Sequence, residues 1–131
     1  MSFKLREIEV FRPYSTEVPE DLLWSMDFSE QEVDRWLNSD LLRVAKLGEQ
    51  VMGVYAMDVT DGVTYLLHGV LVAPSARKQG LGRWLVGHAL GVAESKGARG
   101  VLFPHASHSR FLAAIGFEAH EQGQRFEMYQ E

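Results

Sequence analysis

A basic, glycine-containing turn holds the residues of this sequence whose types and spacing best suit ligand binding. It reads Arg77-Lys78-Gln79-Gly80-Leu81-Gly82 and lies between an apolar run and a helical pattern. Glycine has no Cβ, so the backbone there can approach a ligand closely and can adopt positive φ. The first amides of a helix lack intrahelical partners and carry partial positive charge. Together with the flanking cations, these features predict an anion-binding site.

The spacing of the glycines excludes two common phosphate-binding motifs. A P-loop requires the pattern GxxxxGK[ST], which the sequence does not contain. A dinucleotide-binding GxGxxG motif would begin at Gly80, but the last glycine is replaced by Leu85 and no acidic residue follows at the distance needed for a ribose. The pattern that is present is Arg-x-x-Gly-x-Gly, preceded by the stretch VLVAP.

The strands that must position this turn follow from the hydrophobic pattern. The turns GEQ and TDG have hairpin length, so the strands predicted at 41–47, 51–59 and 63–72 are expected to be antiparallel neighbours. Alternating or continuous apolar residues predict strands at 3–12, 41–47, 51–59, 63–72, 100–104 and 125–130, with a further strand at 117–121.

Helix signals alternate with these strands. Pro19 suits the first position of a short helix, and Ser29 with Glu32 forms a capping box for a second one. A long helix follows the basic turn, and a short helix ends at Gly116. Trp36 falls on the apolar face of the second helix, where we expect it to pack rather than to stack on a ligand.

Composition restricts the class of protein. A chain of 131 residues with 46% hydrophobic and 24% charged residues is expected to fold as one domain, 1–131. The sequence has no cysteine, which excludes disulfides and thiolate chemistry. No apolar run approaches the ~20 residues of a membrane span, and the charged N-terminus does not resemble a signal peptide. We therefore expect a cytoplasmic protein that does not enter membranes.

Charge is distributed unevenly along the chain. The net charge of −5 argues against a general nucleic-acid binder. Residues 1–61 contain 13 acidic and 6 basic side chains, whereas residues 62–117 contain one acidic and 6 basic side chains. The basic part includes the glycine turn, which favours an anionic ligand there, although a buried sheet with few acids would give the same count. His105 and His108 lack a third ligand nearby in sequence, so we expect no metal site.

The strand, the turn and the following helix resemble the acetyl-CoA motif of the GCN5-related N-acetyltransferase (GNAT) family. That motif is a strand ending in L-x-V-x-P, then [RQ]-x-x-G-x-[GA], then a long helix. The stretch RFLAAIGFE at 110–118 is similar to the family's helix-to-strand corner. The resemblance covers most of the chain. It implies an α/β (α+β) fold with a mixed, mostly antiparallel central sheet of about six to seven strands flanked by about four helices.

The resemblance implies acetyl-CoA as the co-substrate. In this family the fourth strand and the next parallel strand separate, and the pantetheine arm pairs with the exposed backbone. Phe103 and Phe111 would narrow the pocket at the thioester. The positions that match the family's backbone and phosphate-binding residues are Val70, Leu71 and Val72 for pantetheine, Gln79, Gly80, Leu81, Gly82 and Arg83 for the pyrophosphate, and Arg77 or Lys78 for the 3′-phosphate.

The implied chemistry is attack of an amine on a thioester, which requires a base. The family often has a glutamate base on the fourth strand, and the matching position here is His68. An imidazole titrates near neutral pH and can serve as a base, and the adjacent Gly69 suits a β-bulge. The alternative is a histidine that is hydrogen-bonded in the sheet without a catalytic role.

A second departure concerns the leaving thiolate. The family's usual tyrosine on that side is replaced by Leu112, which has no hydroxyl group. Candidates to take its place are Tyr65, His105, Ser107, His108 and Ser109.

Two functions are compatible with the resemblance. The first is an N-acetyltransferase that acts on a primary amine of a small molecule or peptide in a ternary complex. Asp21, Asp27 and Glu30 near the first helices weakly suggest a cationic acceptor. The second is a non-catalytic acyl-CoA-sensing regulatory module that binds a partner protein. The missing tyrosine favours this second function. The resemblance also allows a homodimer.

Overall fold

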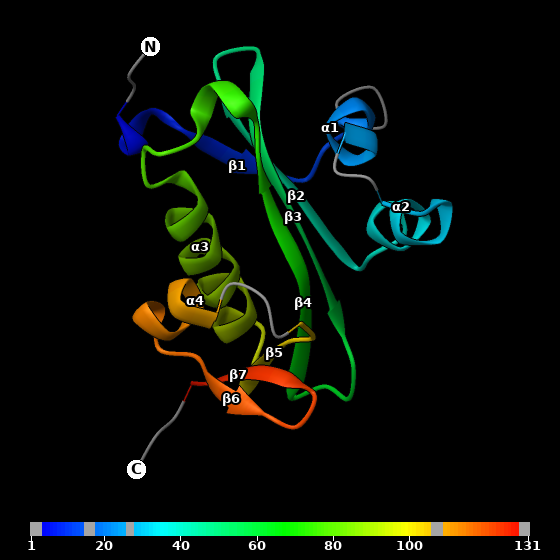
Figure 1. Ribbon diagram of the computed structural model, residues 1–131, viewed down its shortest axis with the longest axis vertical. Coiled ribbons are helices and arrows are strands. Elements are labelled where there is room, and N and C mark those ends of the chain that lie inside the picture. The colour runs from blue at the N-terminus through cyan, green and yellow to red at the C-terminus, as the bar shows by residue number, and fades with distance from the viewer. Residues whose placement is uncertain (1–3, 15–17, 26–27, 106–108, 129–131) are drawn as a thin grey trace.

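A seven-stranded sheet forms the centre of the computed structural model, which describes residues 4–14, 18–25, 28–105 and 109–128 (Figure 1). Its strands lie in the order β1-β2-β3-β4-β5-β7-β6. Among the described residues, β4 and β5 form the one parallel pair, and the other neighbours are antiparallel. The mixed, mostly antiparallel sheet expected from the sequence is confirmed. The strands are β1 (Glu9–Phe11), β2 (Leu41–Leu47), β3 (Gln50–Val59), β4 (Thr64–Val72), β5 (Gly100–Phe103), β6 (Glu118–His120) and β7 (Gly123–Glu127).

The described helices cover both faces of this sheet. Figure 1 shows α1 and α2 on one side, to the right, and α3 and α4 on the other side, to the left. We call these sides the α2 face and the α3 face. None of these helices is long and apolar enough to cross a membrane. The helices are α1 (Glu20–Ser25), α2 (Glu30–Leu37), α3 (Leu81–Ser95) and α4 (Ser109–Ile115).

A hydrophobic core lies on each face of the sheet. On the α3 face, Leu85 of α3 belongs to one cluster with Tyr55 of β3 and Leu67 of β4. On the α2 face, Trp36 of α2 belongs to a second cluster with Val54 of β3. Strands β3 and β4 are thus covered on both sides, and a site at the surface of β4 can be framed by helices from either layer.

Helix boundaries follow the local signals in the sequence. Ser29 Oγ accepts the backbone N–H of Glu32 at 3.1 Å, and Glu32 Oε1 accepts the backbone N–H of Ser29 at 3.4 Å. This reciprocal pair is the predicted capping box of α2. Helix α3 is followed by Gly97 with φ +91°, and α4 by Gly116 with φ +126°. Both glycines adopt the positive φ that commonly ends a helix.

The N-terminal segment differs from the single strand predicted over 3–12. Residues Leu5–Glu7 form a 3₁₀ turn, and Glu9–Phe11 alone pair with β2. The reason lies in the spacing of Leu5 and Ile8, which breaks strand alternation and suits an i, i+3 turn. The Ile8 N–H donates to the Leu5 carbonyl at 3.0 Å, and both side chains contribute to the α3-face core.

The last two strands form a tight hairpin. β6 confirms the further strand predicted at 117–121, and β7 lies slightly earlier than the predicted 125–130. The pair closes at His120 and Gly123. A Cβ at Gly123 would lie 2.2 Å from the Phe103 carbonyl oxygen, so glycine is required for the hairpin to pack against the end of β5. Residues 129–131 lie outside the described residues.

Candidate functional site

Strand β4 contains a β-bulge at His68. The register pairs Ala56 with Gly69 and Met57 with Leu67, which leaves His68 as the extra residue on β4. A bulge places two successive residues on one side of the strand. The His68 side chain lines a pocket with Trp36, and a Cβ on Gly69 would lie 3.0 Å from the Trp36 ring. His68 and Gly69 therefore both face α2, and the predicted bulge is present.

The parallel strands β4 and β5 separate just before this bulge. Their pairing ends at Leu66 and Leu102, whereas β4 continues to Val72. Beyond Leu66, the described strand partner of β4 is β3 alone. On the α3 face, the separation lies beside a pocket of about 250 Å³. This α3-face pocket is lined by Leu67, Val70, Gly82, Val86, Phe103, Phe111 and Leu112.

A second pocket, of about 240 Å³, lies on the α2 face. Successive residues of the two strands line opposite pockets: Leu66 and His68 face this one, whereas Leu67 lines the other. The same alternation occurs at Phe103 and Pro104. The two pockets therefore lie on opposite faces of the sheet, next to the point where β4 and β5 separate. This α2-face pocket is lined by Phe28, Glu32, Arg35, Trp36, Leu66, His68, Pro104 and His105.

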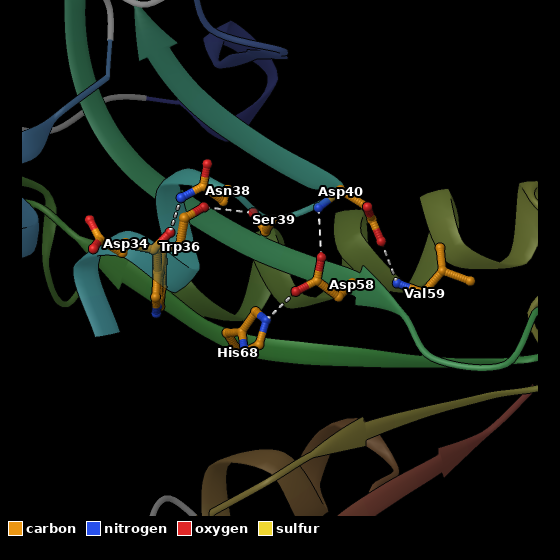
Figure 2. Close-up of polar contacts among 8 residues, drawn as sticks. All are labelled: Asp34, Trp36, Asn38, Ser39, Asp40, Asp58, Val59 and His68. Atoms are coloured by element: carbon orange, nitrogen blue, oxygen red, sulfur yellow. Dashed lines mark hydrogen bonds and ion pairs between the residues drawn. The ribbon is translucent and has the colours of Figure 1, made fainter. Parts of the chain in front are cut away.

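Two carboxylates connect His68 to the neighbouring strands (Figure 2). His68 Nε2 lies 2.6 Å from Asp58 Oδ2, and the Asp58 Oδ1 accepts the backbone N–H of Asp40 at 2.6 Å. Asp40 Oδ2 in turn accepts the Val59 N–H at 3.0 Å. Asp58 is directly opposite Leu66 in the sheet, which makes His68 its diagonal neighbour on the same face. Asp58, which is itself hydrogen-bonded by the Asp40 backbone, thus fixes the Nε2 side of the His68 imidazole.

The electrostatics of this group favour an ionised Asp58. Burial alone would raise the pKa of the Asp58 carboxyl, but hydrogen bonds from His68 and from the Asp40 backbone outweigh that effect and lower the pKa. An anionic Asp58 can only accept a proton from Nε2, so in the neutral form of His68 the proton is on Nε2. Nδ1 then carries the lone pair, and it makes no hydrogen bond within the described part of the chain. The other ionisable groups of the pocket are Glu32, Arg35 and His105.

The glycine turn lies at the N-terminus of α3, as expected. Gly80 is the N-cap residue with φ +81°, and no side chain caps the helix. Leu81 is buried at 1% exposure and anchors this end of α3 in the core. A Cβ on Gly82 would find its nearest atoms 3.8 Å away, at Phe111 and Val72, so the protein itself leaves room for a side chain there. The helix start is thus open toward the α3-face pocket.

The cations of the turn are exposed. Lys78 has φ +65°, an uncommon conformation for a residue with a Cβ. Arg77 Nε donates to the Val72 carbonyl at 3.1 Å, which ties the turn to the end of β4. Arg83 lies on the outer surface of α3, next to Leu5. Of the β4 residues expected to hold a ligand, Val70 lines the α3-face pocket, and Leu71 packs into the opposite core.

The candidates for an acid that protonates the leaving thiolate differ in burial and in the pocket that they line. Tyr65 is 5% exposed and belongs to the α3-face core. His105 is exposed and lines the α2-face pocket. Ser107 and His108 lie outside the described residues, as does the side chain of Ser109. Leu112 is buried at 2% exposure in the wall of the α3-face pocket.

The sequence did not indicate several residues in and around the α2-face pocket. Asp58 precedes His68 by ten positions, and only the hairpin register with its bulge brings them together. Trp36 packs as predicted, at 4% exposure, but it also lines the α2-face pocket with Phe28 and Arg35. The sequence signal that could have found Asp58 is the TDG turn, from which the cross-strand partners can be counted.

Comparisons with known proteins agree with this architecture. The model of the Acetyltransferase (GNAT) family matches residues 5–120. A GNAT family acetyltransferase from Elizabethkingia anophelis with acetyl-CoA bound has a TM-score of 0.80 at 20% identity, over 93% of this chain and 99% of that chain. The IAA acetyltransferase from Bacillus cereus has a TM-score of 0.74 at 26% identity, over 87% and 79%. An acetyltransferase from Bacillus subtilis in complex with CoA has a TM-score of 0.69 at 28% identity, over 85% and 75%. No curated protein sequence matches this chain.

Proposed function

Because the chain belongs to the GNAT acetyltransferase family, we propose that it transfers the acetyl group of acetyl-CoA to a primary amine by direct attack in a ternary complex. The observation that carries this proposal is the position of two pockets on opposite faces of the sheet, next to the point where β4 and β5 separate. One pocket adjoins the N-terminus of α3, and the other contains His68 with its carboxylate partner. A donor and an acceptor bound in these pockets would meet at the gap in the sheet. We also propose that residues 1–131 form a single domain.

The α3-face pocket suits the donor. Acetyl-CoA supplies the acetyl group as a thioester. The β4 backbone of Val70, Leu71 and Val72 extends past the last pairing with β5, so an extended arm could pair with it as an added strand. The amides at the start of α3 suit the pyrophosphate, because no side chain caps them and Gly82 leaves open space beside them. Lys78 adds an exposed positive charge at the same turn.

His68 is the proposed general base. An alkyl amine arrives as an ammonium ion and must lose a proton before its nitrogen can attack. Nδ1 of His68 accepts that proton, while Nε2–H remains hydrogen-bonded to Asp58. The amine nitrogen then bonds to the acetyl carbon, the carbon–sulfur bond breaks, and the second amine proton passes to the departing sulfur. The products are the N-acetyl amide and the CoA thiol, and His68 returns its proton to solvent.

Asp58→Asn tests the role of the carboxylate behind His68. We expect kcat to fall about tenfold or more, with the donor Kd unchanged. Asp61→Asn is the matched control, since Asp61 lies in the same hairpin but lines neither pocket. Wild-type kcat in Asp58→Asn, or an equal fall in Asp61→Asn, would contradict this role.

The same variant tests the ionisation of Asp58 through folding. A lowered carboxyl pKa stabilises the fold while the group is ionised, above its unfolded pKa of about 3.9, and this contribution is lost as pH falls through the folded pKa. Asp58→Asn lacks the contribution at every pH. The difference in free energy of unfolding between wild type and Asp58→Asn should therefore shrink between pH 6 and pH 3 in urea titrations. A difference that grows in acid would contradict the lowered pKa.

Calorimetric titration with acetyl-CoA and with dephospho-CoA tests the proposed donor site. We expect micromolar binding of acetyl-CoA that weakens about tenfold without the 3′-phosphate, since charge-assisted hydrogen bonds to phosphate would be lost. Absence of binding to both compounds would overturn the proposed function. Turnover can then be followed by thiol release, because the chain has no cysteine to react with thiol reagents.

The presence of leucine at position 112 supports a second candidate function, which the same experiments test. The buried Leu112 side chain lines the α3-face pocket where the family usually has a tyrosine hydroxyl. A thiolate is a tolerable leaving group, so catalysis does not require that hydroxyl. Tight acetyl-CoA binding without turnover on any amine would instead support an acyl-CoA-sensing module that binds a partner protein.

A further inference from the structure

The charges in the α2-face pocket differ in how far they are already engaged. Glu32 accepts hydrogen bonds from the backbone and the hydroxyl of Ser29 as part of the α2 cap. His68 is paired with Asp58. Arg35 also lines the pocket, and it makes no hydrogen bond or ion pair with any described residue. Among the described cations that line this pocket, the exposed Arg35 guanidinium is therefore available to a ligand anion, and exposed His105 lies in the same lining.

The remaining walls of the pocket are apolar. Phe28 and Trp36 stand with ring centroids 5.6 Å apart, and Leu66 and Pro104 add apolar surface beside His105. A volume of about 240 Å³ accommodates a small molecule with a compact apolar group. Long polar acceptors such as polyamines would find few partners on such walls, since buried polar groups need hydrogen bonds.

Of the acidic residues that suggested a cationic acceptor, the two that the structure describes do not line this pocket. Asp21 lines a separate hollow beside Lys46 and Glu49. Glu30 is exposed at the start of α2 and does not line the α2-face pocket, and Asp27 lies outside the described residues. The acidic excess of the N-terminal half is therefore a poor guide to the acceptor.

We propose that the acceptor is an amino acid or a similar zwitterion, whose amine reaches His68, whose apolar side chain packs on Phe28 and Trp36, and whose carboxylate pairs with Arg35. This inference rests on the proposed acetyl transfer and specifies its substrate class. A guanidinium matches a carboxylate in a two-point geometry that a lysine cannot reproduce. Arg35 would then be a specificity-determining residue, while His68 and Asp58 serve any amine.

Paired acceptors test the proposal directly. L-leucine and L-phenylalanine are each compared with the amine that lacks the carboxylate, 3-methylbutylamine or phenethylamine, using CoA release. We expect kcat/KM to be about tenfold or more higher for at least one amino acid than for its amine, mainly through KM. Arg35→Gln should remove this preference, because it should lower kcat/KM for the amino acid far more than for the simple amine. Arg35→Lys should retain part of it.

Arg6→Gln is the matched control, because Arg6 is an exposed arginine that lines neither pocket. Equal or better use of the simple amines, or an equal loss on both compounds in Arg35→Gln, would overturn the acceptor class and leave acetyl transfer intact. Acetyl-CoA binding with acetylation of other amines but of no amino acid would overturn it as well. Failure to bind acetyl-CoA would instead overturn the proposed function, and this inference with it.

Discussion

Gly82→Ala is expected to remove most of the affinity for acetyl-CoA while leaving the protein as stable as the wild type. A Cβ at this position meets no protein atom closer than 3.8 Å, so the folded chain accepts it without strain. Alanine is also the better helix former, which would keep the free energy of unfolding unchanged or raise it by up to ~1 kcal/mol. The methyl group would nevertheless occupy the space in which the proposed pyrophosphate approaches the first amides of α3. Overpacking of about 1–3 kcal/mol corresponds to a rise in Kd of about 5- to 150-fold.

The matched control for this variant is Gly91→Ala on the same helix. A Cβ on Gly91 also meets nothing within 4 Å, but Gly91 lies far from the turn and lines no donor pocket. Calorimetry with acetyl-CoA and urea denaturation should be carried out on both variants. Wild-type donor affinity in Gly82→Ala would contradict the placement of the phosphates at this helix start. A large loss of stability in Gly82→Ala would contradict the open space beside the residue.

His68→Gln is expected to lower kcat about 100- to 10,000-fold, the range by which a positioned general base contributes to a reaction. Glutamine keeps a similar size and can still donate a hydrogen bond to Asp58, so the pocket should keep its shape. It cannot accept the proton of the ammonium ion. The donor Kd should remain that of the wild type, because His68 lines the pocket on the opposite face of the sheet.

The measurement is kcat over pH 6–9 with saturating donor, using CoA release. Wild type should show an acid limb that levels off to a plateau. The residual rate of His68→Gln should instead rise with hydroxide over the whole range, without a plateau, as free amine accumulates. His120→Gln is the control, since His120 lies on β6 at the far edge of the sheet. Full turnover of His68→Gln across this range would leave His68 as a hydrogen-bonded sheet residue without a catalytic role.

Local features of this protein could be predicted from sequence because they depend on neighbours along the chain. The capping box of Ser29 and Glu32, the strand β2 at Leu41–Leu47 and the start of α3 at Leu81 all lie where the sequence predicts them. The N-terminal strand was wrong over Leu5–Glu7, because an i, i+3 apolar spacing was treated as strand alternation. Such signals operate over one turn of helix or a few strand residues.

The arrangement of the catalytic candidate required the tertiary structure. His68 could be located by its distance from the glycine turn, and Gly69 indicated the bulge. The partner of His68 was missed, because the diagonal contact of Asp58 with His68 depends on the register between β3 and β4, which has to be counted across the hairpin from the TDG turn. Asp40 joins the group only because β2 pairs with β3 on the other side.

The sequence by itself determined most of the elements, and it predicted an anion-binding turn at residues 77–83 and the position of the candidate base. Only the tertiary structure decided what surrounds that base. The α2-face pocket takes Arg35 and Trp36 from α2, His68 from β4 and Pro104 from the end of β5. These segments come together because α2 packs over the bulge while β5 separates from β4 beyond Leu66. Long-range packing of this kind depends on the shapes of two elements at once, and neither segment encodes it alone.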